Sequence, residues 1–275
     1  MNDEIQTGFV GWFDILGYEQ FLEKNAKDLA HCVEVIQEVI AKAEREVMGE
    51  FKDSILARVP PEKHEEKAFL HEVQRLTKWV VFADTVVLAL PVQAEDIWQA
   101  RFRIATFLHL SKSLFIHFLG SGLPVRGAIS FGTFYMSEHP ALFAGEPLVK
   151  AHQWADNQAW TGCVLTPGAE NIFNQIIAES DPENRKLLAG YVMRWITKPI
   201  LPDFVTAEET MLCLKWPRKI GGFQTEAELL ALIEKQFSRH GKDAQDETVK
   251  AKVKAKIENT IKFARHCREL PSEVL

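Results

Sequence analysis

Two aspartates, Asp14 and Asp84, stand alone in apolar stretches of the sequence, residues 8–18 and 79–91, that hold no other charge. A carboxylate buried in such a setting is costly unless a cation or hydrogen-bond donors meet it. Carboxylate oxygens are also ligands that Mg²⁺ and Mn²⁺ prefer. We therefore expect the fold to bring a positive partner to these residues, and the two aspartates to share divalent metal if their strand ends meet.

The pattern around each aspartate predicts a strand end. Apolar side chains alternate along residues 8–16, with Asp14 on the same side as Val10, which indicates a buried strand. Residues 80–90 are rich in β-branched and apolar side chains and predict a hairpin with its tip at residues 83–85. Each aspartate thus lies where a strand gives way to a turn.

A helical pattern follows the first aspartate and continues to about Val47. The turn over residues 14–18 would then present backbone N–H groups at a helix N-terminus, where phosphate is readily bound. A strand, a tight turn at Gly17 and a surface helix without any ligand explains the same residues. Both interpretations stay open on these residues alone.

The rest of the chain alternates further helices and strands. The order strand, helix, strand, strand, helix, strand over residues 8–132 is that of a ferredoxin-like βαββαβ core, so we predict an α+β fold with a C-terminal helical extension. In this topology the end of the first strand lies beside the hairpin, which would bring Asp14 next to Asp84. The further expected elements are helices at 97–118, 146–160, 167–177, 229–237 and 249–264, and strands at 123–132, 163–166, 194–196 and 211–217. Residues 142–145 are expected only to lead into the helix at 146.

We expect one domain in two parts. Residues 1–180 would form the catalytic core, with a polar insertion at about 48–76, and residues 181–275 would add strands and C-terminal helices packed on the same domain. The lysine-rich face of the last helix is interpreted as a solvated surface.

Composition narrows the class of protein. The chain has 275 residues, 47% hydrophobic and 25% charged, and a net charge of −6, which argues against a general nucleic-acid binder. No apolar run is long enough to cross a bilayer, and the acidic N-terminus does not resemble a signal peptide. The four cysteines lack metal-site spacing and suit reduced thiols. We expect a cytoplasmic protein with no nucleic-acid and no membrane partner.

Four short motifs follow one another between residues 8 and 167. In this order they resemble the class III nucleotide cyclases, and more closely the bacterial pyrimidine cyclases of the Pycsar antiphage system. The motifs are Phe13-Asp14-Ile15-Leu16-Gly17-Tyr18, Phe82-Ala83-Asp84-Thr85, Val125-Arg126-Gly127-Ala128-Ile129-Ser130-Phe131-Gly132, and Gly145 through Lys150-Ala151.

The resemblance implies a homodimer with active sites between its subunits. The enzyme would convert a nucleoside triphosphate to the 3′,5′-cyclic monophosphate and pyrophosphate, using two Mg²⁺ or Mn²⁺ ions per site. Asp14 and Asp84 would be the metal carboxylates, and the Ile15 carbonyl a further metal ligand.

Other residues of the motifs would hold the nucleotide. Arg126 and Lys150 are the candidates to offset phosphate charge as catalytic cations, although Arg126 is equally interpretable as an ion-pair partner that packs the sheet. The residues expected to bind the nucleotide, chiefly through backbone amides at the turn, are Phe13, Leu16, Gly17 and Tyr18.

The chain departs from the purine cyclases of this class at two places. Those enzymes carry an Asn and an Arg one turn apart on the helix that here begins near residue 146, where this chain has Val149 or Lys150 and then Gln153 or Trp154. Val80 stands where they have the Lys that reads adenine. A pyrimidine substrate is therefore expected, UTP before CTP, with a cyclic product that signals to an effector in antiphage defence.

Two other functions remain as alternatives. A degenerate cyclase-like domain would bind nucleotide or a partner without turnover. A palm-type polymerase or dinucleotide cyclase could use the same core, but its Gly-Gly-Asp-Glu-Phe hairpin is replaced here by Phe82-Ala83-Asp84-Thr85. The sequence also lacks a P-loop, a G-x-S-x-G elbow and an H-E-x-x-H motif.

Overall fold

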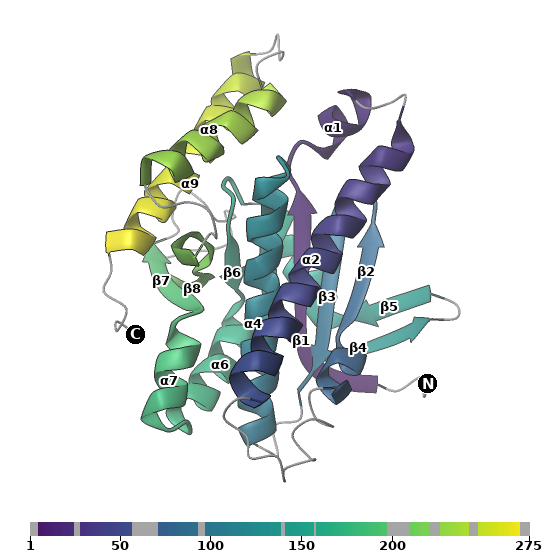
Figure 1. Ribbon diagram of the computed structural model, residues 1–275, viewed down its shortest axis with the longest axis vertical. Coiled ribbons are helices and arrows are strands. Elements are labelled where there is room, and N and C mark those ends of the chain that lie inside the picture. The colour runs from purple at the N-terminus through teal and green to yellow at the C-terminus, as the bar shows by residue number, and fades with distance from the viewer. Residues whose placement is uncertain are drawn as a thin grey trace.

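A mixed sheet forms the centre of the protein in the computed structural model, and helices cover the face seen in Figure 1. The structure describes residues 5–24, 28–56, 71–92, 97–138, 141–156, 158–196, 210–219, 226–241 and 247–269. Among these residues, no helix combines the length and the apolar character needed to span a membrane.

Four antiparallel strands build the part of the sheet that carries the aspartates. β1 (Ile5–Ile15) lies between β3 (Thr85–Pro91) and β4 (Val125–Glu138), and β2 (Lys78–Phe82) pairs with β3. The resulting order β2-β3-β1-β4 is that of the ferredoxin-like core. The predicted α+β class is confirmed.

The sheet continues on the other side of β4. β6 (Cys163–Leu165) pairs parallel to β4, and β8 (Thr210–Leu214) and β7 (Val192–Ile196) follow it, so strands from beyond residue 180 share the same sheet. The division of the chain at residue 180 stays a prediction.

One strand differs from expectation. Residues 141–145, which were expected only to lead into a helix, form β5 (Ala141–Gly145), and this strand pairs with the outer part of β4. Gly145 has φ +153°, and a Cβ there would lie 2.7 Å from the Thr133 carbonyl oxygen. A glycine is therefore required where the chain passes from β5 directly into α5 (Glu146–Asp156).

The helices also differ from expectation in places. α1 (Tyr18–Lys24) and α2 (Leu29–Leu56) replace the single helix predicted after Asp14. Because α2 continues to Leu56, the expected insertion begins inside a helix; residues 57–70 lie outside the described residues, and residues 71–76 are helical. α7 (Pro182–Ala189) was missed, although Asp181 caps it by accepting from the Asn184 N–H and Pro182 begins it. The remaining helices are α4 (Ile97–Gly120), α6 (Pro167–Ala178), η1 (Trp216–Lys219), α8 (Glu226–Gly241) and α9 (Glu247–Glu269).

α4 forms the main core against one face of β1. The Phe13 ring meets Phe115 edge-on at 5.9 Å, and Phe9 lies 5.7 Å from Phe107. α2 packs across the outer side of α4, as Figure 1 shows, and α6, α8 and η1 also pack on it. α4, which is apolar around much of its circumference, is thus covered on more than one side by its own chain.

The opposite face of the sheet holds the smaller cluster and the aspartate. Val10, Val87, Ala89 and Phe134 are buried there, and α5 packs across β1 and β4. Because side chains alternate along a strand, Asp14 lies on this second face. The candidate site is thus separated from the α4 core by the thickness of the sheet.

Candidate functional site

The structure places Asp14 and Asp84 at adjacent strand ends. Asp14 pairs with Thr85 in the register of β1 and β3, and the Ile15 N–H donates to the Asp84 carbonyl at 2.8 Å. The negative charge of Asp84 acts directly on the Asp14 carboxyl. Two residues 70 positions apart in the sequence thus form one acidic locus.

A strained turn presents the second aspartate. Ala83 and Asp84 form the two-residue turn between Phe82 and Thr85, and Ala83 has φ 51°, a region that residues with a Cβ seldom adopt. Strain of this kind persists where the surroundings impose it. The Asp84 carboxylate makes no hydrogen bond or ion pair with the residues that the structure describes, so its oxygens are available to a ligand.

Arg126 on β4 is the direct partner of Asp14. Its Nε and Nη2 lie 2.9 and 2.8 Å from Oδ2 of Asp14, and both side chains are only 15–16% exposed. Both contacts are to the same oxygen. Within the described part of the chain, Oδ1 of Asp14 has no hydrogen-bond partner, so one oxygen of each aspartate could bind a metal ion while Arg126 stays in place.

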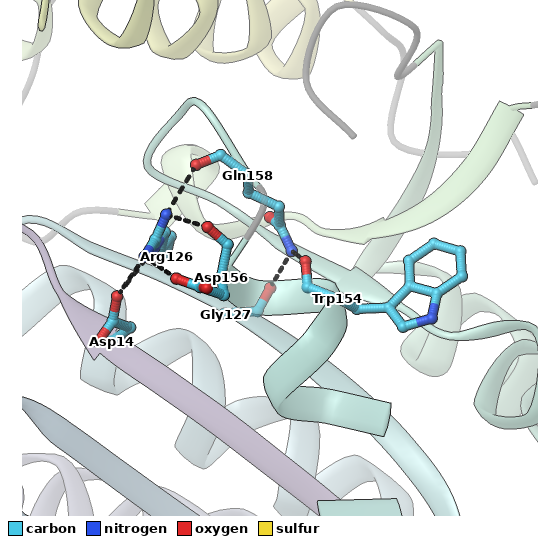
Figure 2. A network of polar contacts seen from close by, with 6 residues as sticks. All are labelled: Asp14, Arg126, Gly127, Trp154, Asp156 and Gln158. Atoms are coloured by element: carbon cyan, nitrogen blue, oxygen red, sulfur yellow. Dashed lines mark hydrogen bonds and ion pairs between the residues drawn. The ribbon is translucent and has the colours of Figure 1, made fainter. Parts of the chain in front are cut away.

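Arg126 is anchored on its other side by the end of α5. Its Nη2 lies 2.6 Å from Oδ1 of Asp156, and its Nη1 donates to the carbonyls of Asp156 and Gln158 (Figure 2). The Gln158 amide in turn donates to the Gly127 and Trp154 carbonyls at 2.8 Å. The guanidinium is therefore fixed between two carboxylates, and backbone carbonyls accept its remaining N–H groups.

Burial dominates the electrostatics of Asp14. It raises the pKa of this carboxyl above the ordinary value of 3.8; the charge and hydrogen bond of Arg126 act in the opposite direction, and Asp84 and Asp156 add to the rise. Arg126 therefore only partly compensates the ionised carboxylate. A second positive charge at Oδ1 would stabilise it.

The turn after Asp14 is only partly available to phosphate. The Leu16 N–H donates to the Pro124 carbonyl at 2.8 Å, so it could bind phosphate only if this bond broke. The Phe13 side chain is fully buried in the α4 core, which leaves only its backbone for a nucleotide. Gly17 takes φ 75° at the turn, and Tyr18 begins α1; their amides remain candidates.

Lys150 is not part of this cluster. It lies on the exposed side of α5 and pairs with Glu146 one turn earlier at 2.7 Å. Among the described residues it forms no ion pair with Asp14, Asp84 or Asp156. Within the described part of one chain, no ion pair therefore joins Lys150 to the two predicted metal aspartates.

The donor set fits a hard divalent cation. Asp14 and Asp84 supply carboxylate oxygens, and Ile15 lies between them on the backbone as the expected carbonyl ligand. The described residues contain no group of three or more His, Cys, Asp or Glu side chains placed for a metal. Remaining ligands would come from backbone, water and substrate, as is usual for Mg²⁺.

Sequence reasoning missed three residues of this site: Asp156, Gln158 and Lys256. The charges of Arg126, Asp14 and Asp156 all act on Lys256, which lies on α9. The next turn of that helix holds Asn259 and Thr260, which the structure shows to be buried. Polar residues on a buried helix face indicate a specific partner.

Comparisons with known proteins leave the family open. No family model matches the chain, and no curated protein matches it. The crystal structure of the guanylyl cyclase Cya2 matches at 10% sequence identity and a TM-score of 0.34, covering 78% of this chain and 93% of its own.

Proposed function

We propose that the protein is a nucleotidyl cyclase, which converts a nucleoside triphosphate to its 3′,5′-cyclic monophosphate and pyrophosphate. The observation that carries the proposal is the convergence of Asp14 and Asp84 at adjacent strand ends, with Arg126 beside them, on a sheet of ferredoxin-like order. The resemblance of the four sequence motifs adds to it.

The residues of the chain would act mainly by position and charge. Asp14 and Asp84 would hold Mg²⁺ or Mn²⁺, which supply stabilisation of the attacking 3′-oxygen and the leaving pyrophosphate. Asp156 and the Gln158 carbonyl keep Arg126 in place when Asp14 shares its charge with a cation. The guanidinium then directs its charge toward phosphate oxygens, for which its planar donor geometry is suited.

The proposed base preference rests on the absence of a Lys at position 80. Val80, at the position where purine cyclases read adenine, packs as an apolar side chain against the Val10 cluster. We therefore favour a pyrimidine nucleotide, UTP before CTP, and a role as the source of a second messenger in antiphage defence. The effector would bind the product and need not touch this protein.

The proposal includes a homodimer. Val81 and Phe82, next to the Asp84 turn, are 47% and 75% exposed, which suits cover by a second subunit. Lys150, which pairs with Glu146 and not with Asp14 among the described residues of its own chain, would then serve the site of the partner.

The test is direct. Purified protein is incubated with each of the four ribonucleoside triphosphates and Mn²⁺, and release of pyrophosphate and formation of the cyclic monophosphate are measured. We expect turnover with UTP and less with CTP. No pyrophosphate from any of the four would defeat the enzyme proposal.

A second function is favoured by a specific observation. Arg126 occupies Oδ2 of Asp14, and the Asn and Arg of the purine enzymes are absent from α5. Both features suit a degenerate domain that binds nucleotide without turnover. Binding of UTP with Mn²⁺, in the absence of any pyrophosphate release, would support this alternative.

A further inference from the structure

Lys256 occupies an inward position on α9. It lies four, seven and eleven residues before Thr260, Phe263 and Cys267, a spacing that puts the four on one face of a helix. The other three are fully buried, and Lys256 is half-buried. The sequence interpretation of the lysine face as solvated is therefore wrong for this residue, although Lys252 and Lys254 are exposed.

α9 is fixed to the segment that anchors Arg126. The Thr161 N–H donates to Oγ1 of Thr260 at 2.9 Å, and Nδ2 of Asn259 donates to the Ala159 carbonyl at 3.0 Å. The Trp160 ring meets Phe263 edge-on at 4.5 Å. These partners directly follow Gln158, so residues 158–161 support both α9 and the Arg126 guanidinium.

Lys256 lies one helical turn before Thr260, on the same helix. Arg126, Asp14 and Asp156 all act electrostatically on its ammonium, and burial lowers its pKa most, with Arg126 adding to the fall. In the described part of the chain no carboxylate forms an ion pair with Lys256 Nζ. After Arg126 on β4, Lys256 is thus a second cation that interacts with Asp14 and Asp156, and it has no ion-pair partner among the described residues. A helix in the yellow of the C-terminal part of the chain runs along the top of the view in Figure 2.

The charges define the ligand that would complete the locus. Asp14 interacts with Arg126, Asp84 and Asp156, and Lys256 interacts with Arg126, Asp14 and Asp156, so the carboxylates of this group exceed its two cations by one charge; Lys252, which also acts on Lys256, is exposed on α9. Divalent ions bound at the aspartates would make the net charge of this group positive. Arg126 and Lys256 would then be positive side chains without enough negative charge around them. An anion with several oxygens can then bind both.

We propose that Lys256 binds the phosphate oxygens of the triphosphate held at the Asp14 and Arg126 locus, so that α9 supplies in the same chain the cation that α5 lacks. The inference rests on the proposed function for its substrate class. It assigns to the C-terminal helix a part of the binding site that the sequence motifs do not include.

The experiment uses inorganic tripolyphosphate with Mn²⁺ as the probe, so that binding is measured without turnover. The dissociation constants of the full-length protein and of Lys256→Met are compared by calorimetry, because Met keeps the apolar stem and removes only the charge. Loss of one charge-assisted contact predicts about tenfold to a hundredfold weaker binding. Lys256→Arg is expected to recover most of the affinity.

The control is Lys254→Met on the same helix, whose side chain is 78% exposed and near Glu258 at 3.9 Å. It should bind as tightly as the parent. Thermal unfolding of both variants identifies any loss of fold, and Lys256→Gln replaces Lys256→Met if the latter unfolds. Equal affinity of the parent and a folded, uncharged Lys256 variant would overturn the inference.

Pyrophosphate release separates this inference from the proposed function. If tripolyphosphate binding depends on Lys256 and no nucleotide is turned over, the cyclase proposal fails and the phosphate site stands. If the parent releases pyrophosphate and Lys256→Met matches it in both KM and affinity, the cyclase proposal stands and the role of Lys256 fails.

Discussion

At the scale of single residues, two cations would compete for the Asp14 carboxylate: the Arg126 guanidinium and the proposed metal ion. Arg126 holds its Oδ2 at 2.8 Å, while Oδ1 has no partner among the described residues. Burial nevertheless raises the pKa of this carboxyl, which means that the fold as it stands does not favour its ionised form. A buried residue kept at such a cost is typical of a functional site.

The first prediction concerns Asp14→Asn. In the folded state the raised pKa keeps this proton at pH values above 3.8, where the unfolded chain has lost it; stability therefore falls as pH rises through that interval and stays lower above it. The Asn variant escapes this penalty and its amide oxygen can still accept from Arg126. We expect it to be at least as stable as the parent at pH 7, with turnover reduced by more than about a hundredfold.

Urea unfolding at pH 7 and at pH 3.5, together with Mn²⁺-dependent pyrophosphate release, checks this prediction. The stability difference should shrink at the lower pH. A variant clearly less stable at pH 7 would show that the ionised pair with Arg126 stabilises the fold instead.

At the scale of elements, the β2–β3 turn and α9 position the site from opposite ends of the sequence. The turn holds Asp84 through a residue with φ 51°. α9 is held by two hydrogen bonds to the segment behind Arg126. Each arrangement yields a prediction about stability.

Ala83→Gly relieves the strained backbone of the turn. We expect the free energy of unfolding to rise by about 1 kcal/mol, because relief of strain exceeds the added entropy of the unfolded chain. The matched control is Ala251→Gly, exposed within α9, which should lower it by about 1 kcal/mol. Chemical denaturation measures both, and a loss of stability in Ala83→Gly would mean that the turn is not strained.

Thr260→Val removes the acceptor of the buried Thr161 N–H. An unsatisfied buried donor costs about 1–3 kcal/mol, and we expect a loss of that size in urea unfolding. Thr260→Ser keeps the hydroxyl and should lose less. If Val and Ser cost the same, the hydrogen bond does not secure α9.

The elements that could be predicted from the sequence are those with a local pattern, and those that were missed depend on tertiary contacts. The alternation of apolar side chains along residues 8–16 and 80–90 was enough to predict β1, β3 and the adjacent ends of these strands, because this pattern is local. The ferredoxin-like order was then predicted from the succession of such local patterns. β5 was missed because its pairing depends on how far β4 extends and on φ at Gly145. Lys256 was missed because its inward position depends on where Thr260 docks, which is a tertiary property.

At the scale of the whole molecule, the distribution of cations bears on the proposed dimer. Arg126 and Lys256 lie at the aspartates of their own chain, whereas Lys150 is exposed on α5 and paired only with Glu146. If two subunits build each site, Arg126 and Lys256 come from the chain that supplies the aspartates, and Lys150 comes from the other chain.

Mixing inactive variants tests this distribution. Asp14→Ala and Lys150→Ala should each be inactive alone. Re-associated at equal amounts, half of the dimers would be mixed and have one intact site of two, so about a quarter of the parent pyrophosphate release should return. Asp14→Ala mixed with Asp84→Ala should recover nothing. Stable dimers without recovery in the first mixture would place Lys150 outside the site.

The bond between Thr161 and Thr260 joins residues 99 positions apart. At roughly 5–20 residues per second of synthesis, the segment behind Arg126 waits about 5–20 s on the ribosome before its acceptor emerges. A chain released early, even one with β1 to β7 complete, would lack this support. A chain that ends before α9 would thus keep Asp14 and Asp84 and lack the helix that braces the segment behind Arg126.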